Sequence, residues 1–170
     1  DRGSDAMPKI DENTAISEPG TYYIYAKTGE TKNYEEERST TAELTVNEAV
    51  VEAASVTKKD GTDGGTYESL PAALNAAQNG DTVTLLSDVD LGETYVTISK
   101  SITFDLNGKT LSSSKTWSSD GVLLVKNATV TVKNGTVKAT GIGSCAIRAY
   151  RSGASMTLEA VTATVTSNKS

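Results

Sequence analysis

Two aspartates in the stretch SDVDL, Asp88 and Asp90, are the closest that the sequence comes to a catalytic pair of carboxylates. Alternate residues of an extended chain point to the same side, so both side chains would face one way. Paired carboxylates can hydrolyse glycosidic bonds, one as the acid and the other as the base or nucleophile. Acidic residues are also common in turns, and the sequence favours that structural role for both aspartates.

Other catalytic or metal-binding groups are scarce. The chain has no histidine, which removes Ser-His-Asp and Cys-His catalysis and imidazole ligands for a metal. Cys145 is the single cysteine, so an intrachain disulfide and a thiolate metal cluster are excluded, and its small, apolar neighbours predict a buried residue. Asp60 and Asp63 lack the further ligands of a calcium loop, and we interpret them as turn residues. The sequence therefore predicts no metal site and no cofactor.

Aromatic and basic side chains provide the candidates for ligand binding. Trp117 lies in the polar stretch SSSKTWSSDG. An exposed indole there would stack on a sugar or anchor a partner protein, whereas an indole folded inward would cover the side of the fold. Arg148, Tyr150 and Arg151 form a small basic and aromatic cluster in AIRAYRSG. Such a cluster can contact a partner protein or an anionic glycan, and a solvated turn is the alternative.

The overall charge limits the classes of partner. The 170 residues carry a formal net charge of -6, which argues against nucleic acid and against an anionic membrane surface, because both need a basic face. No apolar run approaches the roughly 18 residues of a membrane span, so we expect no membrane insertion. Residues 1–9 are interpreted as a cloning-vector remnant or linker.

Residues 10–50 predict a small all-β unit. GTYYIYAK at 20–27 is rich in tyrosine, and TTAELTV at 40–46 alternates apolar and polar residues, so both predict strands. Two strands alone do not form a stable sandwich, and we therefore expect a partial module. The sequence then changes from small apolar residues to a glycine- and aspartate-rich turn, and we place the domain boundary near residue 50, with a second domain over 51–170.

One helix is predicted, over residues 66–80. Ser69 is suited to cap its N-terminus, and Pro71 falls in the first turn, where a missing N–H costs little. Asn79-Gly80 would end the helix. Its apolar face consists of Leu70, Ala73, Leu74 and Ala77. A short helix with one apolar face must cover an apolar surface, and we expect it to cap the strands that follow.

After the helix, a threonine between two apolar residues recurs along the sequence, as Thr84, Thr103, Thr131 and Thr157. Repeats of roughly 20 to 30 residues made of short strands and turns are typical of a β-solenoid, in which each coil stacks on the previous one. Equivalent positions stack from coil to coil, so each of these threonines is predicted to lie beside the next. An antiparallel sandwich built from hairpins is the alternative.

The stretch SITFDLNGKTLSSS, residues 101–114, bears on that choice. Its apolar and polar residues alternate, the alternation stops at Asn107-Gly108, and Leu111 begins it again. This pattern predicts a strand, a corner and a second strand. Because the Asn-Gly turn recurs at one place in a longer repeat, we interpret the stretch as a corner of one coil and not as an isolated hairpin.

GGTYESLPAALNAAQNGDTVTLLSDVDL followed by VTISKSITFDLNGKTLSSS resembles the N-terminal coils of pectate-lyase-like right-handed parallel β-helices, in the version found in large surface proteins of Gram-positive gut bacteria. The resemblance covers about residues 55–170. Residues 19–46 resemble the last strands of a bacterial Ig-like domain. The resemblance implies an all-β chain: a right-handed parallel β-helix with one N-terminal capping helix, preceded by a partial Ig-like β-sandwich.

The same resemblance implies a function. We expect a non-catalytic module of a secreted bacterial cell-wall protein that binds a host extracellular protein or a glycan, beside adjoining domains of the same parent. One alternative is the N-terminal part of a polysaccharide lyase or glycoside hydrolase whose catalytic coils lie beyond Ser170. Another is a segment of a phage tail spike. The chain stops within the strand pattern, so we expect the solenoid to continue or to be closed by another chain.

Overall fold

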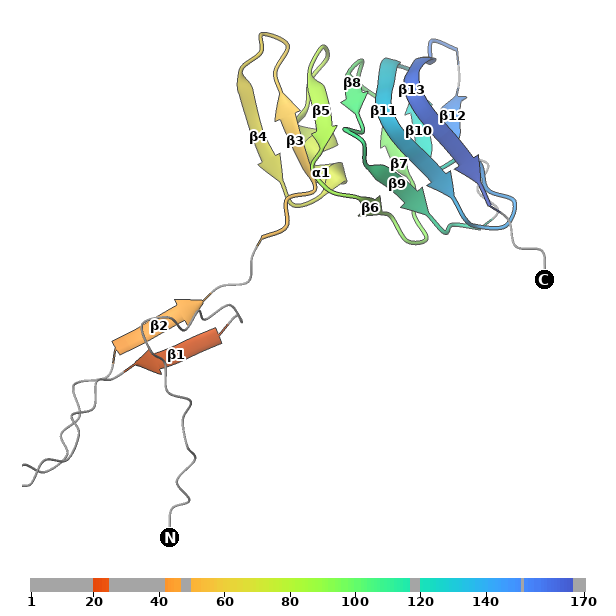
Figure 1. Cartoon of the computed structure of the whole chain (residues 1–170). Helices are drawn as coiled ribbons and strands as arrows, with labels where there is room; N and C mark the ends of the chain where they lie inside the picture. Colours follow the sequence, from red (N-terminus) through yellow and green to blue (C-terminus); the bar gives the residue numbers. More distant parts are fainter. Residues whose placement is uncertain (1–19, 25–41, 47–49, 117–119, 151, 167–170) are drawn as a thin grey trace, which may run out of the picture. The chain divides into compact units, whose positions relative to one another are not determined.

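The computed structural model describes residues 20–24, 42–46, 50–116, 120–150 and 152–166 (Figure 1). The chain divides into two compact units, residues 1–50 and 51–170, and each is described by itself. The described elements are β-strands and a single α-helix. This agrees with the predicted all-β class and its one helix.

The first unit contains two described strands. β1 (Gly20–Ile24) and β2 (Ala42–Val46) pair antiparallel, and both lie within stretches that the sequence predicts as strands. Residues 1–9, interpreted as a remnant or linker, lie outside the described residues. The assignment of residues 10–50 to a partial Ig-like sandwich stays a prediction.

A β-hairpin begins the second unit, where the sequence analysis expected only a turn. β3 (Ala54–Thr57) pairs antiparallel with β4 (Asp63–Tyr67) on one side and with β5 (Thr82–Leu85) on the other. These strands are short, and the glycines of β4 interrupt any alternation of apolar and polar residues, which is why the pattern did not predict them.

The predicted helix is present but shorter than expected. α1 spans Leu70–Ala76, with Ser69 as N-cap: the Ser69 hydroxyl oxygen accepts a hydrogen bond of 3.4 Å from the Ala72 amide. The predicted range of 66–80 was too long, because the residues before Ser69 belong partly to β4 and the chain leaves the helix at Ala77. All four residues of the predicted apolar face are buried, and α1 packs on β3, β4 and β5.

The described strands that follow α1 pair with one another in parallel, in three stacks. The first stack contains β5, β8 (Thr103–Asp105) and the first halves of β11 (Thr129–Ala139) and β13 (Ser155–Val165). The second stack contains β6 (Val89–Asp90), β9 (Thr110–Ser113) and the second halves of β11 and β13. The third stack contains β7 (Val96–Ile98), β10 (Leu123–Lys126) and β12 (Ile147–Tyr150). These parallel partners contradict the alternative of an antiparallel sandwich for this part of the chain.

The strand register confirms two of the three predicted threonine pairings. Thr103 faces Thr131, and Thr131 faces Thr157, as the repeat predicts. The first pairing is wrong: Thr103 faces Thr82 and not Thr84. The error has a simple cause, because a shift of two positions along a strand keeps the same side chains inside and leaves the alternation unchanged.

The corner predicted in residues 101–114 is confirmed. β8 and β9, on either side of Asn107-Gly108, do not pair with each other; each pairs with β11. Asn107 and Gly108 both have positive φ angles, 50° and 74°, the left-handed conformation that these two residue types tolerate best. The Asn107 side-chain amide also donates a hydrogen bond of 3.0 Å to the Leu85 carbonyl of the neighbouring corner.

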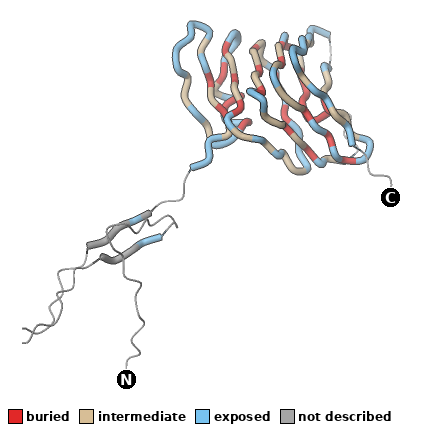
Figure 2. Tube along the Cα trace, in the orientation of Figure 1, coloured by how far each residue is buried: buried red, intermediate tan, exposed pale blue. Residues whose placement is uncertain are grey.

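The core of the second unit lies between the stacks (Figure 2). Each stack contributes a column of inward side chains, such as Val83, Phe104 and Val132 in the first stack, all of them fully buried. The apolar run Val122–Val125 is buried along its whole length, the pattern of a strand covered on both faces. The outward side chains of the strands are mostly polar and form the surface of this unit.

Candidate functional site

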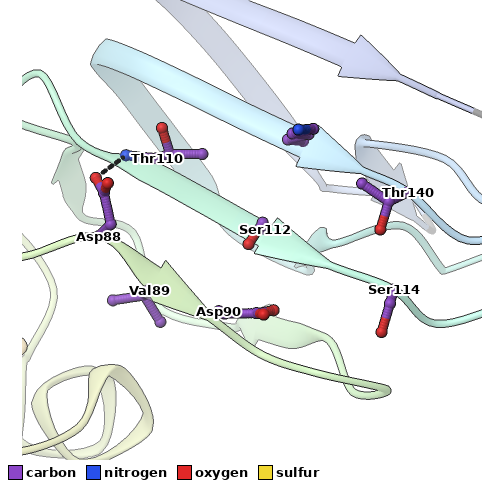
Figure 3. A pocket seen from close by; sticks show the side chains of 8 residues that line it. Asp88, Val89, Asp90, Thr110, Ser112, Ser114 and Thr140 are labelled. Carbon is purple, nitrogen blue, oxygen red and sulfur yellow. Dashed lines mark hydrogen bonds between the residues drawn. The ribbon is translucent and has the colours of Figure 1, made fainter.

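A hollow lined mainly by polar residues lies on the outer face of the second stack (Figure 3). It has a volume of about 430 Å³ and is lined by Asp88, Val89, Asp90, Thr110, Ser112, Ser114, Lys138 and Thr140. These residues belong to β6, β9 and the second half of β11 or directly adjoin them. Three strands that are distant in sequence therefore build one surface.

The strand register sets the order of side chains across the hollow. Asp90 faces Ser112 of the next strand, and Ser112 faces Lys138 of the strand after it. Neighbouring strands in a sheet lie about 4.8 Å apart. A carboxylate, a hydroxyl and an ammonium group therefore follow one another in a row, from three consecutive repeats.

Backbone amides hold both carboxylates of the hollow in place. One oxygen of Asp88, Oδ1, accepts a hydrogen bond of 2.8 Å from the Thr110 amide, as the dashed line in Figure 3 marks. Oδ1 of Asp90 accepts one of 3.0 Å from the Gly92 amide. Each aspartate therefore has the structural role that the sequence favoured, and each keeps its second oxygen for other contacts.

Several polar groups of the hollow have hydrogen-bonding capacity left over. In the described part of the chain, no hydrogen-bond or ion-pair partner is found for the second oxygens of Asp88 and Asp90, the hydroxyls of Ser112 and Ser114, or the ammonium of Lys138. Thr140 differs, because its hydroxyl donates to the Ser113 carbonyl at 3.2 Å. The hollow thus presents acceptors, hydroxyls and one cationic donor to a ligand at the same time.

The hollow lacks the donor set of a metal centre. Among the residues that the structure describes, no three His, Cys, Asp or Glu side chains come together. The turn acids behave as predicted: Asp60 accepts the Thr62 amide at 3.0 Å, and Asp63 accepts the Gly65 amide at 2.8 Å. The hydroxyl of Thr62, which also donates to Asp60, is the main reason why the pKa of that carboxyl lies below its ordinary value.

Two of the four predicted binding residues can be placed. The Arg148 guanidinium lies 4.9 Å from the ring centre of Tyr150, a cation–π contact on β12 in the third stack. Tyr150 is 38% exposed. Trp117 and Arg151 lie outside the described residues. The Arg148–Tyr150 pair belongs to a different stack from the hollow, so the two are separate surfaces.

Cys145 departs slightly from its prediction. It is half-buried rather than buried, and its thiol donates a hydrogen bond of 3.1 Å to the Ile147 carbonyl. The thiol therefore contributes to the turn before β12.

The sequence analysis identified only the two aspartates among the residues that line the hollow. Ser112, Ser114 and Lys138 are ordinary surface residues when each is considered alone. They become a set only through the register, which places residue 112 opposite 90 and residue 138 opposite 112. The signal that was available is the repeat itself, applied to outward residues as well as to the apolar ones.

Among the described residues, no helix has the length and apolar character that a membrane span requires. Comparisons of the chain with protein-family models, with curated proteins and with solved structures found no match.

Proposed function

We propose that residues 51–170 are the capped start of a right-handed parallel β-helix. The support is the return of the chain to the same three stacks, where each strand meets its parallel partner one repeat later. The handedness follows from the rule that crossovers between parallel strands are right-handed in nearly all proteins. The β3–β4 hairpin and α1 form the cap, because they cover the first strand of the first stack.

We propose further that this unit is a non-catalytic binding and display module of a secreted bacterial cell-surface protein, and that the hollow binds a glycan. The observation that carries this proposal is the group of polar side chains without protein partners around Asp90, Ser112 and Lys138, within the described part of the chain. A sugar offers hydroxyls that both donate and accept, so it can satisfy carboxylates, hydroxyls and an ammonium group together. An apolar ligand would leave those groups unpaired.

The anchoring of the aspartates favours binding over catalysis. Hydrolysis of a glycosidic bond needs one carboxyl group that gives up a proton and a second that accepts one or attacks. Asp88 and Asp90 instead each hold a backbone amide at a turn or strand end. Catalytic coils beyond Ser170 and a role in a phage tail spike stay predictions from the resemblance.

A glycan microarray with matched variants tests the proposal. Asp90→Asn together with Ser112→Ala removes one charge and one hydroxyl, while the Asn oxygen still accepts the Gly92 amide. Thr97→Ala is the control, because Thr97 is an exposed hydroxyl residue of the third stack. We expect glycan binding by the natural chain and by Thr97→Ala, with at least a tenfold loss in the double variant. Equal binding by all three chains would refute the site.

A second candidate surface is the Arg148–Tyr150 pair. An exposed tyrosine held under a guanidinium is a common anchor in protein interfaces, so this pair favours a host protein as its partner. A pull-down from host serum and mucus, followed by mass spectrometry, tests this surface. Tyr150→Ala should abolish capture of one saturable protein, whereas the Asp90→Asn and Ser112→Ala double variant should retain it.

A further inference from the structure

The opposite charges of the hollow lie on different strands. Asp90 belongs to β6, and Asp88 directly precedes that strand, whereas Lys138 belongs to β11, beyond β9. Two steps of about 4.8 Å between neighbouring strands therefore separate the backbone of Asp90 from that of Lys138. Ser112, which Figure 3 shows on the strand beside Asp90, stands between them in the register. In the described part of the chain, no ion pair joins Lys138 to either aspartate.

Hydroxyl side chains surround Lys138. Ser112 and Thr164 face it from the two neighbouring strands. Thr136 and Thr140 lie two positions before and after it along the chain, on the same outer face. None of these four neighbours carries a charge. An ammonium group in such surroundings can give an anion one charge-assisted hydrogen bond, and the hydroxyls nearby can add neutral ones.

The β6 side of the hollow has the opposite preference. Asp88 and Asp90 each use Oδ1 to accept a backbone amide and keep the second oxygen for other contacts. The hydroxyls of a neutral sugar can donate to these oxygens. A carboxylate of the ligand at the same place would be repelled, because like charges that are brought together destabilise a complex. The β6 side therefore suits a neutral sugar and opposes an acidic one.

A linear sugar chain that crosses the strands would meet both sides of the hollow at once. The row from Asp90 through Ser112 to Lys138 advances by one strand at each step. One sugar unit of an extended glycan is similar in length to the strand spacing of about 4.8 Å. Three linked sugars would therefore span the row, with the first near Asp90 and the third near Lys138.

We propose that the hollow selects linear glycans that are neutral along most of their length and carry an acidic sugar at one end, with the acid at Lys138 and the neutral units at Asp88 and Asp90. The proposal rests on the proposed glycan-binding function and adds the class of glycan and its direction across the strands. A wholly neutral glycan leaves Lys138 without an anion. A glycan with an acid on every sugar places a carboxylate against Asp90.

Three trisaccharide probes of different charge test this selection. Sialyllactose has its single carboxylate on a terminal sugar, its methyl ester is the same molecule without the charge, and trigalacturonate has a carboxylate on every unit. Each probe is titrated into the ¹⁵N-labelled full chain, and its dissociation constant is measured from the amides of residues 88–92, 110–114 and 138–140. We expect sialyllactose to bind about threefold to fivefold more tightly than its ester, the range of an exposed ion pair. Trigalacturonate should bind most weakly.

Two variants assign these differences to the two ends of the row. Lys138→Met should reduce the affinity for sialyllactose to that for the ester and leave the affinity for the ester unchanged. Asp90→Asn should strengthen the binding of trigalacturonate by about threefold to fivefold, since it removes a repulsion and keeps an oxygen for the Gly92 amide. The amide spectrum shows whether each variant is folded.

Lys126→Met is the control for Lys138→Met. It removes the same charge from β10, in the third stack, and should preserve the difference between sialyllactose and its ester. The chain carries a formal net charge of -6, so attraction by its overall charge does not explain a preference for an anionic sugar.

Equal affinities of sialyllactose and its ester would overturn the selection and leave glycan binding in the hollow intact. A loss of the difference in Lys126→Met as complete as in Lys138→Met would also overturn it, because the preference would then not come from the hollow. If none of the three probes binds at millimolar concentration but the microarray finds a glycan that needs Asp90 and Ser112, the selection alone is wrong. If neither experiment finds binding, the glycan function is wrong as well.

Discussion

Asp81 and Lys58, which are distant in the sequence, form an ion pair of 3.2 Å where the first parallel strand begins. The same carboxylate accepts the backbone amides of Lys59 at 3.0 Å and Gln78 at 2.9 Å, and Asp81 is only 3% exposed. One side chain therefore connects the β3–β4 hairpin, the segment after α1 and the start of β5. In the β-helix that we propose, this contact holds the cap on the repeats.

The Asp81 contact predicts a specific loss of stability in acid. The Gln78 amide, with Lys58 and the Lys59 amide, holds the pKa of the Asp81 carboxyl below its ordinary value of 3.8. The pKa of Asp81 is lower in the folded chain than in the unfolded chain. The carboxylate therefore contributes its full stabilisation at pH values above the unfolded pKa, and this stabilisation is lost as the pH falls through the folded pKa. At pH values below about 4, we expect the melting temperature to decrease as the pH is lowered. The fall should be smaller in Asp81→Asn, measured by thermal melts from about pH 2 to 6.

Glu93→Gln is the control for the acid experiment, because Glu93 is exposed and lies outside the cap. Its pH profile should follow that of the natural chain. An Asp81→Asn profile with the same slope as the natural chain would contradict the assigned role.

Lys100 closes the C-terminal end of α1. Its ammonium donates to the carbonyls of Leu74 at 3.0 Å, Asn75 at 2.7 Å and Ala77 at 2.7 Å, which are groups that a helix end leaves without partners. We expect Lys100→Met to lower the free energy of unfolding by about 1–3 kcal/mol, the range of hydrogen bonds to charged groups. Urea unfolding measures the change.

Lys109→Met is the matched comparison for Lys100→Met, because no hydrogen bond or ion pair of the Lys109 side chain is found in the described residues. It should change stability by less than about 0.5 kcal/mol. An equal effect of both substitutions would show that the ammonium of Lys100 does not stabilise the helix end.

Gly141 lies close to the backbone of the preceding repeat. A Cβ atom at this position would overlap the Lys115 carbonyl oxygen and lie 2.6 Å from that of Ser114. Backbone atoms cannot move away as a flexible side chain can, so we expect Gly141→Ala to cost more than about 2 kcal/mol. Gly92→Ala is the comparison: it meets open space but has a φ of 58°, and should cost about 1 kcal/mol. Chemical denaturation measures the free energy of unfolding of both variants. A larger loss in Gly92→Ala than in Gly141→Ala would contradict the close packing at Gly141.

Ala160 is a position where the natural residue is not the most stable choice. It has a φ of 54°, and its neighbours Glu159 and Val161 face the two neighbours of Asn134, whose φ is 58°. Alanine is strained in this left-handed region, whereas asparagine tolerates it. We expect Ala160→Asn to raise the free energy of unfolding by about 0.5–1 kcal/mol and Asn134→Ala to lower it by a similar amount. If Ala160→Asn does not stabilise the chain and Asn134→Ala does not destabilise it, the two positions do not share the left-handed conformation.

The features that depend on local sequence could be predicted. The face of α1 and its Ser69 cap follow from helical spacing and capping chemistry, and the Asn107-Gly108 corner follows from the break in alternation. The pairings of Thr103 with Thr131 and of Thr131 with Thr157 were also correct. The first of these joins two repeats that each contain an Asn-Gly pair after the threonine, Asn107-Gly108 and Asn134-Gly135, and this shared pair aligns the two repeats. The glycine-rich hairpin of β3 and β4 carried no such pattern, and it was missed.

The hollow was not predicted, because its residues come together only through the strand register. Asp88 and Asp90 stood out as a pair only because they are close in sequence. Lys138 joins them through two successive strand pairings, and alternation alone does not distinguish one register from another shifted by two positions. The Arg148–Tyr150 contact was easier to predict, since both residues lie on one short strand.

An NMR titration of the ¹⁵N-labelled chain with O-linked oligosaccharides released from mucin tests the central claim most directly. If the hollow binds a glycan, the largest changes in backbone amide chemical shift will occur at residues 88–92, 110–114 and 138–140. These changes will saturate as the sugar concentration rises. The same titration of the Asp90→Asn and Ser112→Ala double variant will show no saturation. Chemical-shift changes at residues 147–150 instead, or no changes at millimolar sugar, would contradict glycan binding in the hollow.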